Sequence, residues 1–362
     1  MSAPDFDLLL RQAIEAARWA PSSHNCQPWR VAVVPGACEN ERLLRLTLDQ
    51  GRRLTALESL DLEMALSVGL FLGLLVTALQ RLGLACEWAM DDASDPSPKG
   101  EISMAIVTVR RAPARVVGGV DWESFVDLVR RRRTCRAPFA PDPPSAEAIA
   151  AMSIRRWPET LTGSALEIRA EADPKTLKSV AELTARYAAL DFTHLKAWSE
   201  TYRHLRFGEP GDEDVVDGIF VDSLLGPMTP FKRRLLRFAL SPLAMQALRP
   251  FGGSSRMADA LAGLVAAGPG LVCCSLPEER PRRQDLLQAG ARLAEVWLNA
   301  QAAGLALHPV SVLLQHDAPR REIQRLLRLS TRRPVFVARF GLALLNPSIS
   351  PRRSVDAILR ME

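Results

Sequence analysis

An apolar stretch at residues 62–82 constrains the fold more than any other part of the sequence. Residues 64–79 contain no charged side chain, and Glu63 stands just before them. A helix that is apolar on every side must be enclosed by other elements, and this uncharged part is shorter than the ~20 residues that a membrane span needs. We therefore predict a buried central helix, which a second helix can approach closely at Gly69 and Gly73.

The charge balance and the cysteines limit the partners and the compartment. The chain of 362 residues has a net charge of +5 but only five lysines, so arginine supplies nearly all of the positive charge. No basic stripe interleaved with aromatic residues accompanies it, which favours an anionic cofactor over a nucleic acid. The six cysteines show no C-x-x-C pair and no metal-binding spacing with histidine. Because residues 1–10 do not read as a signal peptide, we expect a cytoplasmic protein with reduced thiols and no metal site.

Residues 20–30 read A-P-S-S-H-N-C-Q-P-W-R and predict a rigid polar loop. Pro21 ends the helix predicted over residues 5–19, and Pro28 holds the residue before it extended, ahead of a strand at 29–34. The polar members are Ser22, Ser23, Asn25 and Gln27. Their donors and acceptors suit a flat heterocycle with carbonyls and ring nitrogens. By composition alone, such a loop more often only separates a helix from a strand.

The string A-P-S-S-x-N-x-Q-P-W closely resembles the flavin-contacting loop of the FMN-dependent nitroreductase family. The resemblance implies that five residues flank the flavin ring and its ribityl chain, namely Pro21, Ser22, Ser23, Asn25 and Gln27. Cys26 lies inside this loop, and the resemblance assigns it no role.

A second resemblance follows the helix predicted over residues 121–133. The run of arginines at 130–133 can be explained by the helix macrodipole alone. However, Arg132, Thr134 and Arg136 match the R-x-[ST]-x-R motif of the same family, which holds the flavin phosphate and ribityl chain. Forked, charge-assisted hydrogen bonds suit that task.

Two further segments resemble family elements near the end of the chain. Residues 304–311 resemble the loop that follows a long helix, predicted here over 283–303, and the resemblance implies that the backbone near Val310 and Ser311 meets the N5 edge of the flavin. The sequence P-R-R-S-V at 351–355 is similar to the element whose arginine reaches the phosphate, which points to Arg352 or Arg353. His308 could donate a proton, although a histidine before proline is more often structural.

The order of predicted elements indicates an α+β protein. Strands are predicted at 43–48, 86–90, 102–109, 166–170, 271–275 and 335–342, helices at 146–156, 174–190 and 256–267, and a turn-rich segment at 91–100. The resemblance to fused, single-chain (Acg-type) nitroreductase-like proteins implies a pseudo-dimer of two half-units, each with a mainly antiparallel sheet packed by helices. The halves would be residues 1–120 and 121–362, with one FMN between them.

Residues 192–252 fit neither half-unit. This segment is rich in aromatic and basic residues, and we expect a helical lid over the cofactor or an arm that docks on a second copy. A basic amphipathic element on a membrane surface, at residues 212–250, is the less favoured alternative.

The resemblance implies an FMN-dependent oxidoreductase that moves two electrons through flavin N5. NAD(P)H or the substrate itself would be the reductant, and no side chain is assigned as catalytic. The alternative is a protein that sequesters FMN with little or no turnover. We expect a small-molecule substrate of unspecified class, no nucleic-acid partner, and either a monomeric pseudo-dimer or a homodimer. A membrane partner is the less favoured alternative.

Overall fold

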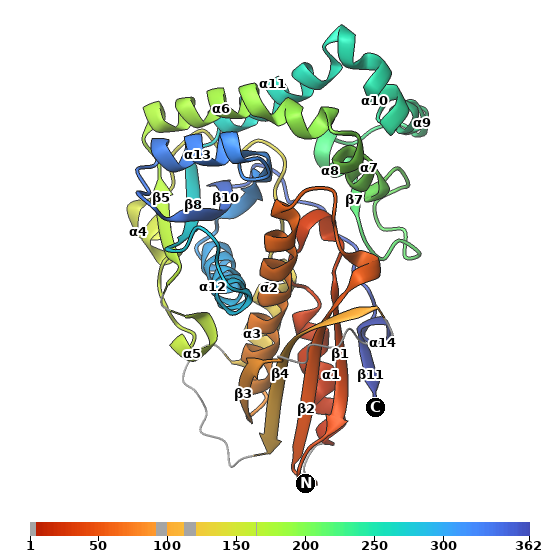
Figure 1. Cartoon of the computed structure of the whole chain (residues 1–362), viewed down its shortest axis with the longest axis vertical. Helices are drawn as coiled ribbons and strands as arrows, with labels where there is room; N and C mark the ends of the chain where they lie inside the picture. Colours follow the sequence, from red (N-terminus) through yellow and green to blue (C-terminus); the bar gives the residue numbers. More distant parts are fainter. Residues whose placement is uncertain (1–4, 92–99, 112–120, 164) are drawn as a thin grey trace.

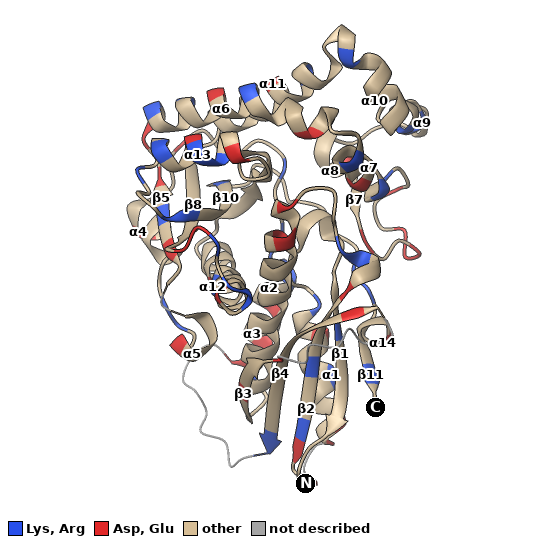
Figure 2. Cartoon of the chain, viewed as in Figure 1, with Lys and Arg blue, Asp and Glu red and all other residues tan. Residues whose placement is uncertain are grey.

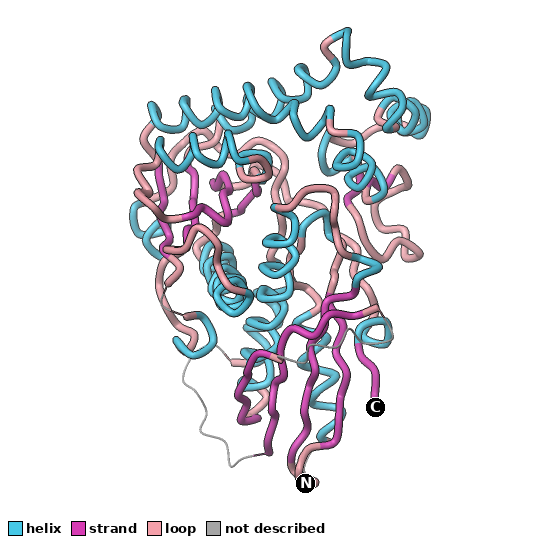
Figure 3. Tube along the Cα trace, in the orientation of Figure 1, coloured by secondary structure: helices cyan, strands magenta, loops and turns pink. Residues whose placement is uncertain are grey.

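The computed structural model describes residues 5–91, 100–111, 121–163 and 165–362. They form two main sheets, one short two-stranded sheet, and helices between and around them (Figures 1 and 3). Most of the turn-rich segment predicted at 91–100 and the proposed boundary at residue 120 lie outside the described residues. The mixture of helices with two mainly antiparallel sheets confirms the α+β prediction.

The first sheet has five strands. Their spatial order is β11 (Leu359–Met361), β1 (Trp29–Pro35), β2 (Glu41–Asp49), β4 (Glu101–Arg111) and β3 (Leu84–Met90). Every neighbouring pair is antiparallel except β11, which runs parallel to β1 with Val31 opposite Leu359. The end of the chain therefore completes the sheet formed by the start of the chain.

The second sheet has four antiparallel strands. Their spatial order is β5 (Glu167–Glu171), β8 (Gly270–Leu276), β10 (Arg333–Gly341) and β9 (Ala306–Pro309). Helices α6 (Pro174–Thr193) and α11 (Gly253–Ala266) lie side by side across the top of Figure 1. A smaller core joins this layer to the sheet, because Leu177 and Val180 of α6 pack in one cluster with Leu271 and Cys273 of β8.

The central helix is α2 (Ser59–Arg81), and its partner is α12 (Arg283–Ala302). All residues of α2 from Met64 to Leu79 are buried. This helix is the single one in the described part that is long and apolar enough to span a bilayer, but 89% of its apolar window is buried inside the protein, which is typical of a core helix. The prediction of a buried central helix is confirmed.

The two central helices touch through glycine. A Cβ atom on Gly69 would lie 2.4 Å from the carbonyl oxygen of Leu287, and one on Gly290 would lie 2.3 Å from that of Leu66. Because both obstacles are backbone atoms, any side chain here would push the helices apart. The close approach predicted at Gly69 is therefore made by α12.

The remaining elements cover the sheets or lie in the insertion. Outside the insertion are α1 (Phe6–Ala17), η1 (Ser23–Asn25), η2 (Gln50–Arg52), α3 (Trp122–Arg131), α4 (Ala146–Ala151), α5 (Glu159–Thr162), η4 (Ser311–Leu313), α13 (Asp317–Leu326) and α14 (Val355–Ile358). Between residues 192 and 252 are α7 (Leu195–Arg203), β6 (Leu205–Arg206), β7 (Ile219–Phe220), α8 (Asp222–Leu225), α9 (Pro230–Ala239), α10 (Pro242–Leu248) and η3 (Arg249–Phe251). The predicted insertion is mostly helical.

Polar contacts attach the segment 192–252 to residues 52–56 near the start of the chain. The carboxylate of Glu200 accepts hydrogen bonds from the backbone N–H groups of Thr55, at 2.9 Å, and Ala56, at 3.0 Å. Arg52 pairs with Asp217 at 2.8 Å. Only 6% of Glu200 is exposed, so these contacts fix where the base of the insertion sits.

Candidate active site

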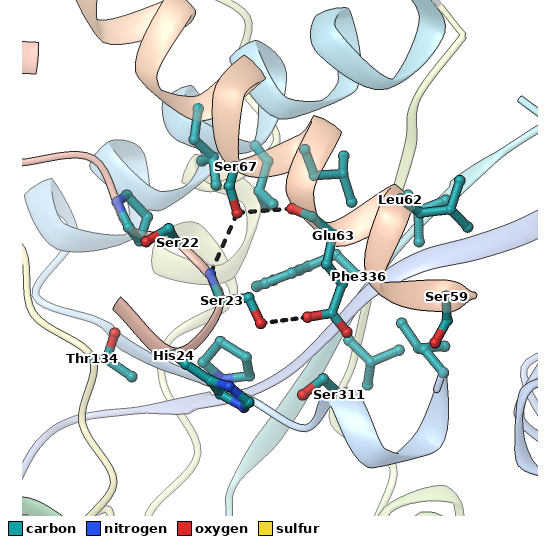
Figure 4. Close-up of a pocket in the computed structure, with 18 of the residues that line it drawn as sticks. Ser22, Ser23, His24, Ser59, Leu62, Glu63, Ser67, Thr134, Ser311 and Phe336 are labelled. Carbon is teal, nitrogen blue, oxygen red and sulfur yellow. Dashed lines mark hydrogen bonds between the residues drawn. The ribbon is translucent and has the colours of Figure 1, made fainter. Parts of the chain in front are cut away.

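A cavity of about 230 Å³ is lined by residues from distant parts of the chain. Residues before position 120 contribute the loop at 21–24 and the start of α2, and residues after it contribute Thr134, Arg136, α12 and β10. Ile219 of the insertion also lines it. Figure 4 shows Ser23 of the loop bonded through its N–H to Ser67 Oγ of α2, with Ser311 of η4 bordering the same cavity. The cavity is thus a composite of three parts of the chain that are far apart in sequence.

The loop at 22–27 has an unusual backbone. His24, Asn25 and Gln27 have φ angles of 49°, 56° and 48°, a left-handed region that non-glycine residues rarely occupy. The prediction that Pro28 keeps Gln27 extended is therefore wrong. Local hydrogen bonds hold this shape, including one from the Gln27 N–H to Ser22 Oγ at 2.9 Å. Strained backbone of this kind persists where surrounding contacts over-determine it, often at functional sites.

Asn25 and Gln27 lie behind the cavity lining and brace the loop. The Asn25 amide donates to the carbonyls of Gly218 and Pro351, each at 3.0 Å, and its oxygen accepts from Arg352 at 2.7 Å. The side-chain oxygen of Gln27 accepts a hydrogen bond from the backbone N–H of Arg353 at 2.9 Å. Arg353 also donates to the carbonyls of Gln27 and Trp29. The motif residues of the loop and of the tail are therefore brought together, and any cofactor contact by these four stays a prediction.

Two arginines at the cavity have no acidic partner among the described residues, and one of them, Arg132, is not itself part of the lining. Arg132 is 4% exposed and its guanidinium lies 5.1 Å from the Trp297 ring centroid. Its Nη2 donates to the Trp19 carbonyl at 3.3 Å, but Nε and Nη1 have no partner among the described residues. Arg136 lines the cavity. Within the described part of the chain, neither side chain pairs with a carboxylate.

This arrangement depresses the pKa values of the arginines. Burial, followed by repulsion from Arg133 and Arg136, lowers the pKa of Arg132 to about 9. Burial also lowers the pKa of Arg136 to about 10, and burial with the nearby Arg132, Arg133 and Arg18 lowers that of Arg352. Buried cations with unpaired N–H groups are costly unless an anion neutralises them. The donor set of these arginines fits a phosphate group.

Two more of the residues expected to contact the cofactor, Thr134 and Ser311, line the cavity, but Val310 does not. The backbone of Thr134 forms a bridge with Leu307, and the Cys135 N–H donates to the Leu307 carbonyl at 3.1 Å. The segment 134–136 is therefore fixed beside β9. Val310 is 1% exposed and its N–H donates to the Val337 carbonyl at 2.8 Å, so Ser311 is the member of this pair that reaches the cavity.

Sequence reasoning missed Glu63 as a cavity residue. Its carboxylate accepts hydrogen bonds from Ser23 Oγ at 2.6 Å and from Gln315 at 3.3 Å (Figure 4 draws the first). Burial, with a smaller contribution from Asp191, raises its pKa. The only signal in the sequence was that Glu63 stands directly before the uncharged stretch, near the start of a helix that also carries Asp61. An ordinary solvated helix end looks the same.

Cys26 and His308 have structural surroundings. Burial raises the pKa of Cys26 to about 12, so it stays a thiol rather than the reactive thiolate. His308 lines the cavity and its Nδ1 accepts a hydrogen bond from Arg339 Nε at 2.9 Å. Burial and the neighbouring Arg339 and Arg136 hold its pKa well below the usual value. All six cysteines are free thiols.

His24 should make the protein sensitive to acid. Burial, then His204 and Arg136, lower its pKa to about 3 from a usual value near 6.5. The folded state gains stability from the neutral ring above pH 6.5 and loses it as the pH falls from 6.5 toward 3, at up to ~1.4 kcal/mol per pH unit. We expect His24→Asn to have a shallower pH dependence of unfolding free energy in urea, since asparagine tolerates this backbone. Equal slopes between pH 7 and 5 would contradict this.

Comparison with known proteins places this geometry in a family. The model of the nitroreductase family matches residues 7–65. The chain is 34% identical to PigM of Serratia sp., named a probable NAD(P)H nitroreductase, over 98% of this chain and 94% of that protein. The chain belongs to the nitroreductase family. The nitroreductase-like assignment made from the loop and arginine motifs is therefore confirmed.

Two more distant nitroreductases also match the chain. Acg of Mycobacterium tuberculosis, a putative NAD(P)H nitroreductase, is 25% identical over 98% of this chain and 96% of its own. Among solved structures, the FMN-dependent nitroreductase NfnB of Mycobacterium smegmatis, in complex with NADPH, covers 65% of this chain and 96% of its own. It aligns with 17% identity and a TM-score of 0.40.

Proposed function

We propose that this nitroreductase holds one FMN in the cavity between its halves and acts as an oxidoreductase with NAD(P)H as reductant. One observation carries the proposal. Arg136 lines the same cavity as Ser22 and Ser23. Arg132 lies against the cavity residue Trp297, and its Nε and Nη1 have no partner among the described residues. The name of PigM, a probable NAD(P)H nitroreductase, supports the reductant.

Each group of residues would have a separate task. Arg132, Thr134 and Arg136 would hold the phosphate end, while Pro21, Ser22, Ser23 and Ser311 would border the ring. When bound, the flavin supplies the two-electron chemistry. Glu63, with its raised pKa and its hydrogen bond to Ser23, could hold a proton at the edge of the cavity. The apolar side chains of Ile219 and Phe336 would exclude water from one wall.

The two-sheet architecture supports a division into fused half-units near residue 120. Each half has an antiparallel sheet, and each supplies one of the two helices that meet at Gly69 and Gly290. The tail from residue 351 crosses back to the first half through β11. A cytoplasmic location agrees with the six free thiols. The size of the cavity suits a small organic molecule as substrate.

The docked insertion favours a second candidate, storage of FMN without turnover. Ile219 lines the cavity, and the carbonyls of Val216 and Gly218 accept hydrogen bonds from Gln27 and Asn25. An insertion that stays closed would keep nicotinamide away from the flavin.

Rapid mixing with NADPH or NADH separates the two functions. For the enzyme, we expect the absorbance of the bound flavin to bleach within seconds and to recover when an oxidising substrate such as a quinone is added. Free FMN at the same concentration serves as the control for direct reduction. A protein that retains its FMN but does not bleach with either nucleotide would favour storage instead.

A further inference from the structure

The insertion carries a surface that the cavity does not use. Residues 223–258, called the basic arm below, contain six basic side chains and no acidic one, which are Lys232, Arg233, Arg234, Arg237, Arg249 and Arg256. In Figure 1 its helices α9 and α10 project from the upper right of the molecule, away from both sheets, and Figure 2 marks no acidic position along them.

The basic arm also exposes large apolar side chains. Phe231, Phe238 and Phe251 are 76%, 74% and 75% exposed, and Leu243 is 81% exposed. Eight of the eighteen large hydrophobic residues that are exposed in the described part of the chain lie in these 36 positions. Exposed apolar groups that gather in this way mark an interaction site.

On α9 the apolar and basic side chains are sorted by face. One face of α9 carries Phe231, Leu235 and Phe238, four and three residues apart. These three residues are called the α9 stripe below. At 3.6 residues per turn, Arg234 and Arg237 fall on one side of this stripe and Lys232 on the other. The opposite face is fixed to the protein, because Arg233 pairs with Asp222 at 2.9 Å. The stripe and its flanking cations therefore face outward.

We propose that the basic arm docks on an anionic lipid surface. An outward apolar stripe between cations is the pattern that lies in the interface of a bilayer, with the apolar groups among the acyl chains and the cations at the headgroups. Self-association through the same stripe is disfavoured, because two-fold pairing would bring the cations of two arms together with no carboxylate in either. From the sequence alone, attachment of residues 212–250 to a membrane surface was the less favoured interpretation. The outward exposure of Phe231, Leu235 and Phe238 makes it the favoured one for the basic arm.

Sedimentation with vesicles tests the proposal on the full-length protein. We expect it to sediment with phosphatidylcholine vesicles that contain phosphatidylglycerol, and to remain in solution with phosphatidylcholine alone. High salt should weaken the binding. The double variant Arg234→Gln/Arg237→Gln should bind roughly 30-fold more weakly, on the basis of about 1 kcal/mol for each cation.

A triple variant, Phe231→Ser/Leu235→Ser/Phe238→Ser, isolates the stripe. It should lower the partition coefficient at least ~10-fold, while its thermal unfolding stays unchanged because these side chains are exposed. The matched control is Leu344→Ser/Leu345→Ser, which removes two exposed leucines, 60% and 68% exposed, outside the arm. Three results would each overturn the proposal: no binding to anionic vesicles, unchanged binding by the triple variant, or a wild-type dimer that the triple variant dissociates. None of these outcomes depends on whether FMN is bound or reduced.

Discussion

Replacing Gly290 with alanine is expected to lower the free energy of unfolding by about 3 kcal/mol, the upper end of the usual cost of overpacking. The added Cβ would lie 2.3 Å from the Leu66 carbonyl oxygen and 2.7 Å from the Gly69 Cα. No rotamer change can relieve a clash between two backbones, so α2 and α12 must separate. Because Leu66 and Trp297 on these helices line the cavity, the variant should also retain less flavin.

Gly263→Ala is the matched control for this experiment. Gly263 lies within α11, and a Cβ atom there would meet nothing within 4 Å. Alanine favours helix over glycine by up to ~1 kcal/mol, so this variant should be as stable as the wild type or slightly more stable. Chemical denaturation of both variants gives the comparison. If Gly290→Ala unfolds at the same denaturant concentration as Gly263→Ala, the helices do not touch in this way.

Arg136→Gln is expected to weaken FMN binding by roughly 100-fold, since truncating one partner of a charge-assisted contact in a buried site typically costs 2–5 kcal/mol. Arg132→Gln should have a similar effect, because neither guanidinium group has an acidic partner among the described residues and burial lowers the pKa of both. Riboflavin lacks the phosphate, so its affinity should change little in either variant. Titration of the apoprotein with each flavin, followed by fluorescence, measures both affinities.

The run of arginines contains its own control. Arg131 belongs to the same run, but it is exposed and pairs with Asp127 at 2.7 Å. Arg131→Gln should leave FMN affinity within about two-fold, as expected for an exposed ion pair. If all three variants lower the affinities for FMN and riboflavin equally, the arginines act on folding and not on the phosphate. The helix macrodipole would then be the better explanation of the run of arginines.

Local sequence patterns predicted the elements well where one physical cause dominates. The uncharged stretch at 64–79 could only be enclosed, and it became the core of α2. The helix predicted at 146–156 ends at Ala151 instead. Its last residues turn their backbone toward α12, where the buried Arg292 bonds to the carbonyls of Ser153 and Ile154. Such a distant, buried partner leaves no mark on the local pattern.

The candidate site was predictable through its motifs and not through its contacts. The strings around Ser22 and Arg136 identified two walls of the cavity, and the structure brings both to one place. Glu63 and the bracing roles of Asn25 and Gln27 depend on partners between 40 and 327 residues away. Single-sequence reasoning cannot reach that range, because each partner looks like an ordinary polar residue in its own segment.

The flavin content of the purified full-length protein shows whether the cavity holds one FMN. The cavity is lined both by Arg136 and by the Ser22–Ser23 loop, so we expect a yellow protein with one FMN per chain. Absorbance at the flavin band, with the flavin then released by denaturation and identified by chromatography, gives both the ratio and the species. A colourless protein that takes up no FMN when the cofactor is supplied, or one that binds two per chain, would contradict the account.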